Sequence, residues 1–584
     1  MPGTITSDQT TIEDAEVVAD YLVLGTFASA QALNDDIKVQ GANAINGRVS
    51  ANTAWSLATT GAALDLTVTD RHVWQWLRLI TWPSADTKAN GGLGISMSSD
   101  PTPTLTGVSP SNGPTNSKTW FLGGSDTEVT TGWVCYCVDP NGTPDLTIGT
   151  PVMSSIDRVG MRCKVTGTVS NKTLNLHHDV LRYGTGLTIK DGTSGSPVAL
   201  VDIATADALN ANAWGVVTQQ SGIYFVAGKL YFGTTGQTAI TYFKDTNKIV
   251  VFPFFPVAAS FYELRLAGAG SFLTTFVLGT YSGSLASGGC TIKGAGSGSS
   301  IAIWTLTASA ANTLCLLSAC VFSEMRSAAF KSDSEIRSCT FDNSGEVTAS
   351  GATFSFCTFL NLRTTTPISA VYQIRVNTTT PTITDCAFIN CATAILWDRN
   401  ADTSGKLDRC AFTSGGTGHA IELGANTPTT ISIVDVSFTG YGGTPGSNAV
   451  ASSGSTDAAI YNNSGKAITI NVSGGTTPAI RNGAGATTIV NSTVAVQFTG
   501  LATGSEVRAY LNASPYTEQD GTDSSAGSTH TLSLPSGVAV DIVILGPTTD
   551  PLVTYTPVRI NNQTYSVAQS VPSGQLRDRN FSNP

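Results

Sequence analysis

One triplet, with a small residue first and phenylalanine third, recurs through the middle of the chain and decides the fold. It reads Cys320-Val-Phe322, Cys339-Thr-Phe341, Cys357-Thr-Phe359, Cys386-Ala-Phe388, Cys410-Ala-Phe412 and, as a variant, Val436-Ser-Phe438. Successive phenylalanines lie 18 to 29 residues apart, and such a recurrence is typical of a solenoid. Because side chains alternate along a strand, the first and third residues point the same way. The pattern therefore predicts interior ladders of Cys and Phe in a right-handed parallel β-helix.

The triplets lie within residues 250–495, and we expect this whole segment to form the β-helix. Its later coils lack the triplet but keep short apolar runs that end in asparagine, as in Ala459-Ile-Tyr-Asn-Asn463. Asparagine suits the tight turns between strands. Residues 496–584 carry apolar runs between Gly and Pro turns, which predicts an immunoglobulin-like β-sandwich. Such a sandwich would also cover the last coil of the solenoid.

Two regions precede the solenoid. Residues 1–30 are expected to contain a helix, because the apolar residues from Ile12 to Leu22 have helical spacing and acids lie in the first turn. We interpret this region as an N-terminal anchoring segment; a helix packed on its own domain is the alternative. Residues 31–249 predict a β-sandwich, with strand-like runs such as Val73–Ile80 and Ile223–Phe232 between turn signals.

Composition limits the classes of function. Only 12% of the residues are charged, the net charge is −10, and glycine is abundant at 59 residues. The acidic balance argues against a nucleic-acid-binding surface and against binding to anionic lipid. No apolar run approaches the ~18 residues that a membrane-spanning helix needs. The N-terminus lacks the basic and apolar stretches of a secretory signal, so we expect assembly in the cytoplasm of the producing cell.

The chain has eleven cysteines, and eight of them lie in the repeat region. The triplet cysteines stand where a small buried apolar residue would serve, and buried free cysteine behaves as such a residue. We therefore predict reduced core cysteines, with disulfides or a metal site as the alternatives. Cys135-Tyr-Cys137 lacks the spacing of a zinc knuckle and fits a strand instead.

Three stretches of the first predicted sandwich carry a resemblance. They are Gly132-Trp-Val134 through Val138-Asp-Pro140, Ser155-Ile-Asp-Arg-Val-Gly-Met161, and Asp179-Val-Leu-Arg-Tyr-Gly-Thr-Gly-Leu187. Together they resemble the concanavalin-like jelly-roll modules of bacteriophage structural proteins. The resemblance implies a jelly roll and brings no catalytic signature with it.

Acids are scattered through the β-helix segment, and phage tailspikes, which this architecture resembles, cut polysaccharide with paired carboxylates. Glycoside hydrolysis needs two carboxyl groups ~5–9.5 Å apart. Asp398 and Asp402 form the best local pair, since Trp397 beside them could stack on a sugar ring and Arg399 could bind it. The alternative, which we favour, is a solvated loop that does no chemistry.

Two further motifs carry weaker signals. The loop Gly192-Thr-Ser-Gly-Ser-Pro197 resembles the nucleophile loop of chymotrypsin-fold proteases, but no matching histidine and aspartate motif accompanies Ser194, so we expect an ordinary turn. His419 near Glu422 offers too few ligands for a metal. We expect no metal and no cofactor.

These inferences favour a bacteriophage virion protein displayed on the particle surface, as a head decoration, head fibre, tail fibre or tailspike. It would bind a host surface or glycan, form a homotrimer, and attach to other capsid or tail proteins through its N-terminal region. A tailspike depolymerase, which would be a polysaccharide hydrolase or lyase, is the second hypothesis, and a bacterial surface adhesin is the third.

Overall fold

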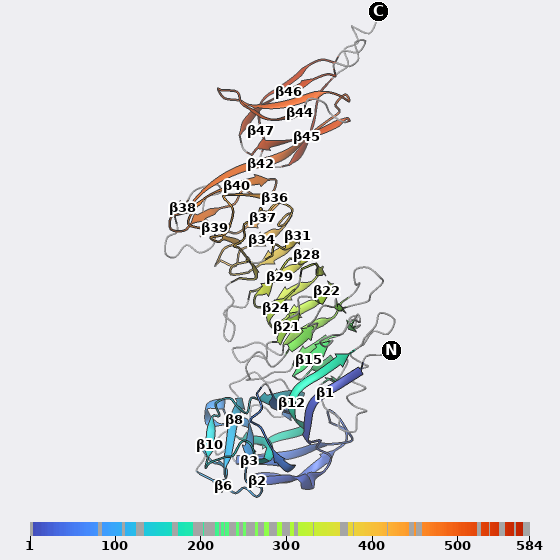
Figure 1. The fold of residues 1–584 in the computed structure, drawn as a ribbon, viewed down its shortest axis with the longest axis vertical. Helices are drawn as coiled ribbons and strands as arrows, with labels where there is room; N and C mark the ends of the chain where they lie inside the picture. The colour runs from blue at the N-terminus through green and yellow to red at the C-terminus, as the bar shows by residue number, and fades with distance from the viewer. Residues whose placement is uncertain are drawn as a thin grey trace, which may run out of the picture. The chain divides into compact units, whose positions relative to one another are not determined.

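The structure is a computed structural model of the 584-residue chain (Figure 1). It describes residues 4–69, 71–79, 85–107, 111–123, 133–165, 173–190, 203, 217–220, 223–226, 228–232, 241–243, 249–252, 263–266, 274–278, 289–294, 304–308, 313–330, 332–362, 372–377, 379–416, 418–442, 449–450, 458–522, 527–536, 538–547, 555–565 and 568–575. Two compact units make up the chain: one comprises Met1–Ala352 and Arg363–Ala370, and the other comprises Thr353–Leu362 and Val371–Pro584.

The first unit begins with an antiparallel β-sandwich. Its longest strand, β3 (Ala44–Leu64), pairs at one end with β11 (Ile156–Lys164) and at the other with β12 (Thr173–Lys190), so it serves both layers. Next to β12 lies β4 (His72–Leu79), whose Trp74 and Trp76 are fully buried. Four further strands are β5 (Leu93–Ser98), β8 (Ser117–Gly123), β9 (Trp133–Val138) and β10 (Leu146–Ile148), and the short strands β6 (Leu105–Thr106) and β7 (Gly113–Pro114) pair with each other. The predicted N-terminal sandwich is therefore confirmed.

The predicted N-terminal helix is wrong. The residues concerned form β1 (Thr4–Glu13), a single 3-10 turn at Val18–Asp20, and the start of β2 (Tyr21–Asn34). Strand β1 pairs with β12, and β2 pairs with β3, so both belong to the sandwich. The helical spacing of a few apolar residues was outweighed by this long-range pairing, and Ala15 breaks the segment with a φ of 62°.

Parallel strands follow the sandwich in three rows. The first row is β14 (Ile223–Val226), β17 (Ile249–Phe252), β20 (Thr291–Gly294), β23 (Val321–Ser323) and β26 (Thr340–Asp342). The second continues from β12 through β15 (Lys229–Phe232), β18 (Glu263–Leu266), β21 (Trp304–Ala308), β24 (Met325–Ala329) and β27 (Val347–Thr348). The third is β16 (Thr241–Phe243), β19 (Thr274–Leu278), β22 (Thr313–Ser318) and β25 (Glu335–Arg337).

The chain visits the three rows in turn, one strand in each, and this is the path of a parallel β-helix. The run Ile223–Phe232, which its sequence assigns to the sandwich, supplies two of these strands, so the parallel stacking starts before residue 250. Alternation alone could not separate the two cases, because strands of both kinds are apolar when both faces are covered.

The second unit repeats the three-row path. The triplet row holds β29 (Thr358–Leu360), β32 (Ala387–Ile389), β34 (Ala411–Thr413) and β37 (Ser437–Thr439). The next holds β30 (Ile374–Val376), β33 (Ile395–Trp397), β35 (Ile421–Leu423), β39 (Ile460–Asn462) and β41 (Ile480–Asn482). The third face carries β28 (Thr353–Ser355) and β31 (Thr382–Thr384), and later β36 (Thr430–Val434), β40 (Ala467–Ser473) and β42 (Thr487–Thr499).

Phenylalanines of neighbouring coils stack on one another along the triplet row, as their shared position in the triplet predicts. In the first unit Phe322 lies opposite Phe341, with ring centroids 5.2 Å apart. In the second unit Phe359, Phe388 and Phe412 stack with centroid distances of 4.7 and 4.8 Å. All five side chains are at most 1% exposed. Their planes are nearly parallel because each ring is held at the same register position of the next coil.

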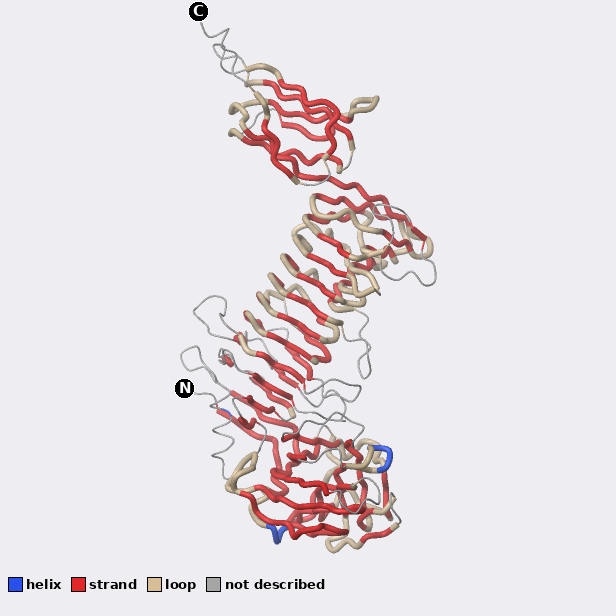
Figure 2. Tube along the Cα trace, turned by 180° about the vertical axis from the view of Figure 1, so that it is seen from behind, coloured by secondary structure: helices blue, strands red, loops and turns tan. Residues whose placement is uncertain are grey.

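The chain ends in a second antiparallel sandwich (Figure 2). Strand β42 passes from one fold to the other: its first half pairs parallel with β40, and its second half pairs antiparallel with β45 (Thr529–Pro535). It thus runs through the predicted boundary at residue 496. The opposing sheet holds β43 (Glu506–Leu511), β44 (Glu518–Thr522), β46 (Ala539–Leu545) and β47 (Val558–Thr564), while β48 (Gln569–Pro572) pairs with β42. Among the described residues, no helix is long and apolar enough to cross a membrane.

Candidate functional site

The predicted sugar-binding tryptophan is buried. Trp397 ends strand β33, points into the interior and has an exposed fraction of 0%. Its indole Nε1 donates a hydrogen bond to the carbonyl oxygen of Ala401 at 3.0 Å. The hydroxyl of Thr427 and the amide of Gly424 donate to its own carbonyl oxygen. Trp397 therefore fills the core and shapes the following loop, so its predicted role as a stacking platform for a sugar is wrong.

The two candidate carboxylates next to Trp397 bind backbone amides. Oδ1 of Asp398 accepts the amide of Asn426 at 2.7 Å, and Oδ1 of Asp402 accepts the amide of Ser432 at 2.6 Å. The Ser432 hydroxyl adds a further bond to Asp402 at 3.2 Å. Both aspartates thus join their loop to the neighbouring coil, and the described geometry gives them a structural task. Arg399 is exposed beside them.

A different feature stands out at the corner that precedes each triplet. The residue before the triplet adopts the left-handed conformation in every coil from Cys320 to Val436, with φ between 52° and 56°. These residues are Ala319, Ser338, Phe356, Asp385, Arg409 and Asp435. For a residue with a side chain this conformation costs about 1–2 kcal/mol, so glycine or asparagine normally takes it.

The corner after the triplet follows that ordinary preference. In the second unit the residue two places beyond the phenylalanine has positive φ in three coils, where it is Asn361, Asn390 or Gly440; in the coil of Phe412 it is Ser414, whose φ is not positive. The Asn390 side chain donates to Oδ1 of Asn361 at 2.7 Å, which links neighbouring coils. In the second unit, positive φ at the corner after the triplet is therefore taken only by asparagine or glycine, whereas the corner before the triplet carries phenylalanine, aspartate and arginine; in the first unit Glu324 also has positive φ after its triplet.

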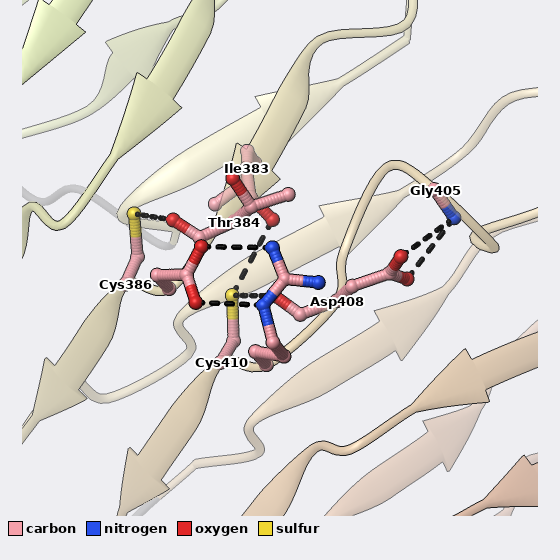
Figure 3. A network of polar contacts seen from close by, with 8 residues as sticks. Ile383, Thr384, Cys386, Gly405, Asp408 and Cys410 are labelled. Carbon is pink, nitrogen blue, oxygen red and sulfur yellow. Dashed lines mark hydrogen bonds and ion pairs between the residues drawn. The ribbon is translucent and has the colours of Figure 1, made fainter.

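An ion pair joins two coils at the unusual corner (Figure 3). Nε of Arg409 lies 2.7 Å from Oδ1 of Asp385, and Nη2 lies 2.9 Å from Oδ2, so the contact is bidentate. The hydrogen bond and the charge of Arg409 lower the pKa of Asp385 and keep it ionised. Beneath it, the loop carboxylate of Asp408 accepts the amide of Gly405.

The buried triplet cysteines form hydrogen bonds to the backbone of this corner. In each case the thiol donates to the carbonyl oxygen two residues earlier, as for Cys386 with Thr384 at 3.2 Å (Figure 3). The Cys339 thiol donates to the carbonyl oxygen of Arg337 in the same way, at 3.4 Å. The left-handed corner turns that carbonyl toward the sulfur. A cysteine at this position therefore contributes a donor as well as apolar volume, which valine at position 436 lacks.

All eleven cysteines are free and buried, in agreement with the prediction. Burial raises the pKa of the Cys315 and Cys391 thiols to about 12, so both remain protonated at neutral pH. Because the thiolate is the nucleophilic form of cysteine, these protonated thiols are unreactive at neutral pH.

The N-terminal sandwich contains a buried polar cluster around His178. Nε2 of His178 lies 3.1 Å from Oγ of Ser56 and 3.2 Å from Nε2 of Gln31, and Nδ1 lies 3.4 Å from the Gln75 amide. Burial lowers the pKa of His178 to about 3, so the ring is neutral at physiological pH. Although Ser56 and His178 have the spacing of a nucleophile and base, both are completely buried, and a substrate cannot reach them.

Asp179 beside this histidine is held by backbone amides. Its carboxylate accepts the amides of Val39 at 2.7 Å, Gln40 at 3.2 Å and Val180 at 2.8 Å. Burial raises its pKa to about 7. It fixes the loop that follows β2 rather than orienting His178 for catalysis.

The remaining sequence candidates do not assemble a site. Ser194 and its loop lie outside the described residues. Nδ1 of His419 contacts the carbonyl oxygen of Ala458, and Oε1 of Glu422 accepts a hydrogen bond from the side-chain Nδ2 of Asn463, so each has a separate structural partner. Within the part of the chain that the structure describes, no group of three or more His, Cys, Asp or Glu side chains is arranged to hold a metal.

Comparison with known proteins gives little beyond the fold class. No family model matches the chain, and no curated protein matches it. Among solved structures, the crystal structure of an agarase, AgWH50C, is similar at 10% sequence identity and a TM-score of 0.19. The match covers 30% of this chain and 24% of the agarase chain. The assignment of an all-β protein with parallel β-helix coils and antiparallel sheets therefore rests on the strand registers.

Proposed function

We propose that the chain is a bacteriophage virion structural protein, displayed on the particle surface as a head decoration, head fibre or tail fibre. It acts by holding a binding surface rigidly against a host or its glycan, and it has no catalytic step. The observation that carries the proposal is the use of the β-helix residues: the triplets fill the interior with stacked phenylalanines, and the candidate carboxylates Asp398 and Asp402 bind backbone amides.

Physical arguments support a display role. Within the second unit, successive coils pair strand to strand along the triplet row, which keeps the surface residues of these coils at fixed intervals. The concanavalin-like resemblance of the first sandwich adds the association with phage structural proteins. A homotrimer, joined to other virion proteins through the N-terminal region, forms part of the same proposal, since bundling multiplies weak contacts with a surface.

Two other functions remain as competitors. A tailspike depolymerase would shorten a host polysaccharide, and a bacterial adhesin would be found on a cell envelope. Neither is favoured by a specific contact among the described residues.

Labelling of particles tests the proposal directly. Antibodies against the C-terminal sandwich would be applied to particles purified from lysates of the producing cells and viewed by negative-stain electron microscopy. Label on the outer surface of the particles is expected. Label confined to cell envelopes, with no particle carrying the chain, would overturn the proposal.

A further inference from the structure

One corner of the second unit presents an exposed aromatic ring in a backbone conformation that disfavours it. Phe356 has a φ of 55° and is 55% exposed, the only exposed phenylalanine among those whose side-chain burial is described. A bulky residue is a genuine outlier in the left-handed region, and such outliers cluster at binding sites. The corner after the triplet shows that this chain can place asparagine or glycine where positive φ is required.

Phe356 belongs to a line of side chains that crosses successive coils. Its amide donates to the carbonyl oxygen of Thr384, so it lies at the register of Asp385. The amide of Asp385 donates to Asp408, which places Asp385 beside Arg409, and the amide of Arg409 donates to Val434, which places it beside Asp435. We name Phe356, Asp385, Arg409 and Asp435 the corner stripe. Its members recur about every 4.8 Å, the spacing of parallel strands.

The polar half of the stripe is rigid and still has hydrogen-bonding capacity. A guanidinium carries five N–H donors, and the contact with Asp385 uses Nε and one donor of Nη2. The Arg409 side chain remains 51% exposed, which leaves the outer edge of its fork accessible to solvent. Because Asp385 fixes the fork, little side-chain entropy would be lost on binding a ligand.

We propose that the corner stripe binds a neutral polysaccharide, with Phe356 stacking on the apolar face of a pyranose and Arg409 and Asp385 bonding hydroxyls of the next sugar. This inference deepens the proposed function, on which it rests, by naming the ligand class and its site. An aromatic face beside a charged hydrogen-bonding pair matches a sugar, which has C–H groups on one face and hydroxyls around its edge.

Charge selects the neutral class of polysaccharide. The stripe holds one cation and two carboxylates, and Arg409 is already neutralised by Asp385. The whole chain carries a net charge of −10. A polyanionic glycan would therefore be repelled by both the stripe and the rest of the surface.

The test uses the full-length chain on a printed array of neutral and acidic bacterial polysaccharides, followed by affinity electrophoresis with the neutral glycan retained best. The variants are Phe356→Asn, which suits the left-handed backbone, and Arg409→Lys, which keeps the charge but loses the fork. We expect each to weaken binding at least tenfold. Phe356→Asn should leave the melting temperature unchanged or raise it, so that lost binding cannot be ascribed to unfolding.

Matched controls lie outside the stripe. Ile389, which is 39% exposed, and Arg559, which is 63% exposed and paired with Asp541, are replaced by the same residue types, as Ile389→Asn and Arg559→Lys, and both variants should bind like the wild type. Three results would overturn the inference: no neutral glycan retained by the wild type, retention of acidic glycans only, or unchanged binding by both stripe variants. Loss of oligomers on Phe356→Asn, with glycan binding intact, would assign the ring to a contact between chains and also overturn it. None of these results would remove the chain from the particle surface, so the proposed function is tested separately.

Discussion

Truncation of Phe359 tests the interior ladder of phenylalanines where two neighbouring rings are most nearly parallel. Its ring lies 4.7 Å from that of Phe388 with an angle of 6° between the planes, and 6.0 Å from that of Phe354. The side chain is 0% exposed, so Phe359→Ala removes buried apolar surface and leaves a cavity between coils. Replacements of this kind cost about 3–5 kcal/mol. We expect that loss to fall mainly on the local stability of the second unit, since coils interact chiefly with their neighbours.

Hydrogen–deuterium exchange of the full-length protein measures this loss locally. A cost of 3–5 kcal/mol corresponds to an opening constant raised by roughly one hundred- to four-thousand-fold, since about 1.4 kcal/mol is tenfold. Amides of β29, β32 and β34 should lose protection by that factor, while those of the N-terminal sandwich should not change. A global melting temperature is a less sensitive measure of this local loss, because it averages over the several units of the chain.

Two companion variants separate the contributions. Phe359→Leu keeps apolar volume but removes the ring stack, so it should cost less than Phe359→Ala. Ile389→Ala changes an exposed residue of the neighbouring coil and should leave protection nearly unaltered. If Phe359→Ala altered exchange by less than tenfold, or no more than Ile389→Ala does, the stacked interior would not stabilise the coils as we argue.

Three other predictions concern thiols, pH and the loop aspartates. Thiol titration should find almost no reactive cysteine in the native protein and eleven after denaturation without reductant; a low denatured count would reveal disulfides. His178 has a folded pKa of about 3 against 6.5, so its contribution to stability is present above pH 6.5 and is lost as the pH falls toward 3. The free energy of unfolding of the wild type, followed by tryptophan fluorescence in denaturant, should therefore fall more than that of His178→Gln, by about 2–3 kcal/mol, from pH 7.5 to 4.5. An unchanged difference between the two proteins would show that the ring is not held neutral. Asp402→Ala should cost about 1 kcal/mol by freeing the Ser432 amide, whereas an unaltered denaturation midpoint would deny the carboxylate a structural task.

The interior of the β-helix was predictable from sequence because phenylalanine occupies the third position of every triplet. Phe322, Phe341 and Phe359 stand at the same position of each triplet, and a shared position in a strand means a shared face. The sequence predicted the triplet cysteines as buried apolar residues. Their thiol hydrogen bonds depend on a positive φ at the residue before each triplet, and the residue types at that position do not indicate it. At the corner after the triplet, by contrast, Asn361 and Asn390 do indicate a positive φ, since asparagine favours the left-handed region.

The candidate site was not predictable in the same way. Asp385 and Arg409 lie 24 residues apart, and only the length of an intervening coil brings them to one register. Asp398 and Trp397 looked like a site because they are adjacent in sequence, yet adjacent residues of a strand point to opposite sides. That alternation sends Trp397 into the core. The helix expected before Leu22 failed for a related reason, since pairing with β12 and β3 outweighs local spacing.

The most direct test of binding without catalysis is to incubate the purified full-length chain with the polysaccharide that it retains and to follow the length of that polysaccharide. Reducing ends and unsaturated products would be measured over time, together with the size distribution. We expect retention on the glycan with no shortening and no new ends. Shortening that Asp398→Asn or Asp402→Asn abolishes while the fold stays intact would contradict the account and establish a depolymerase.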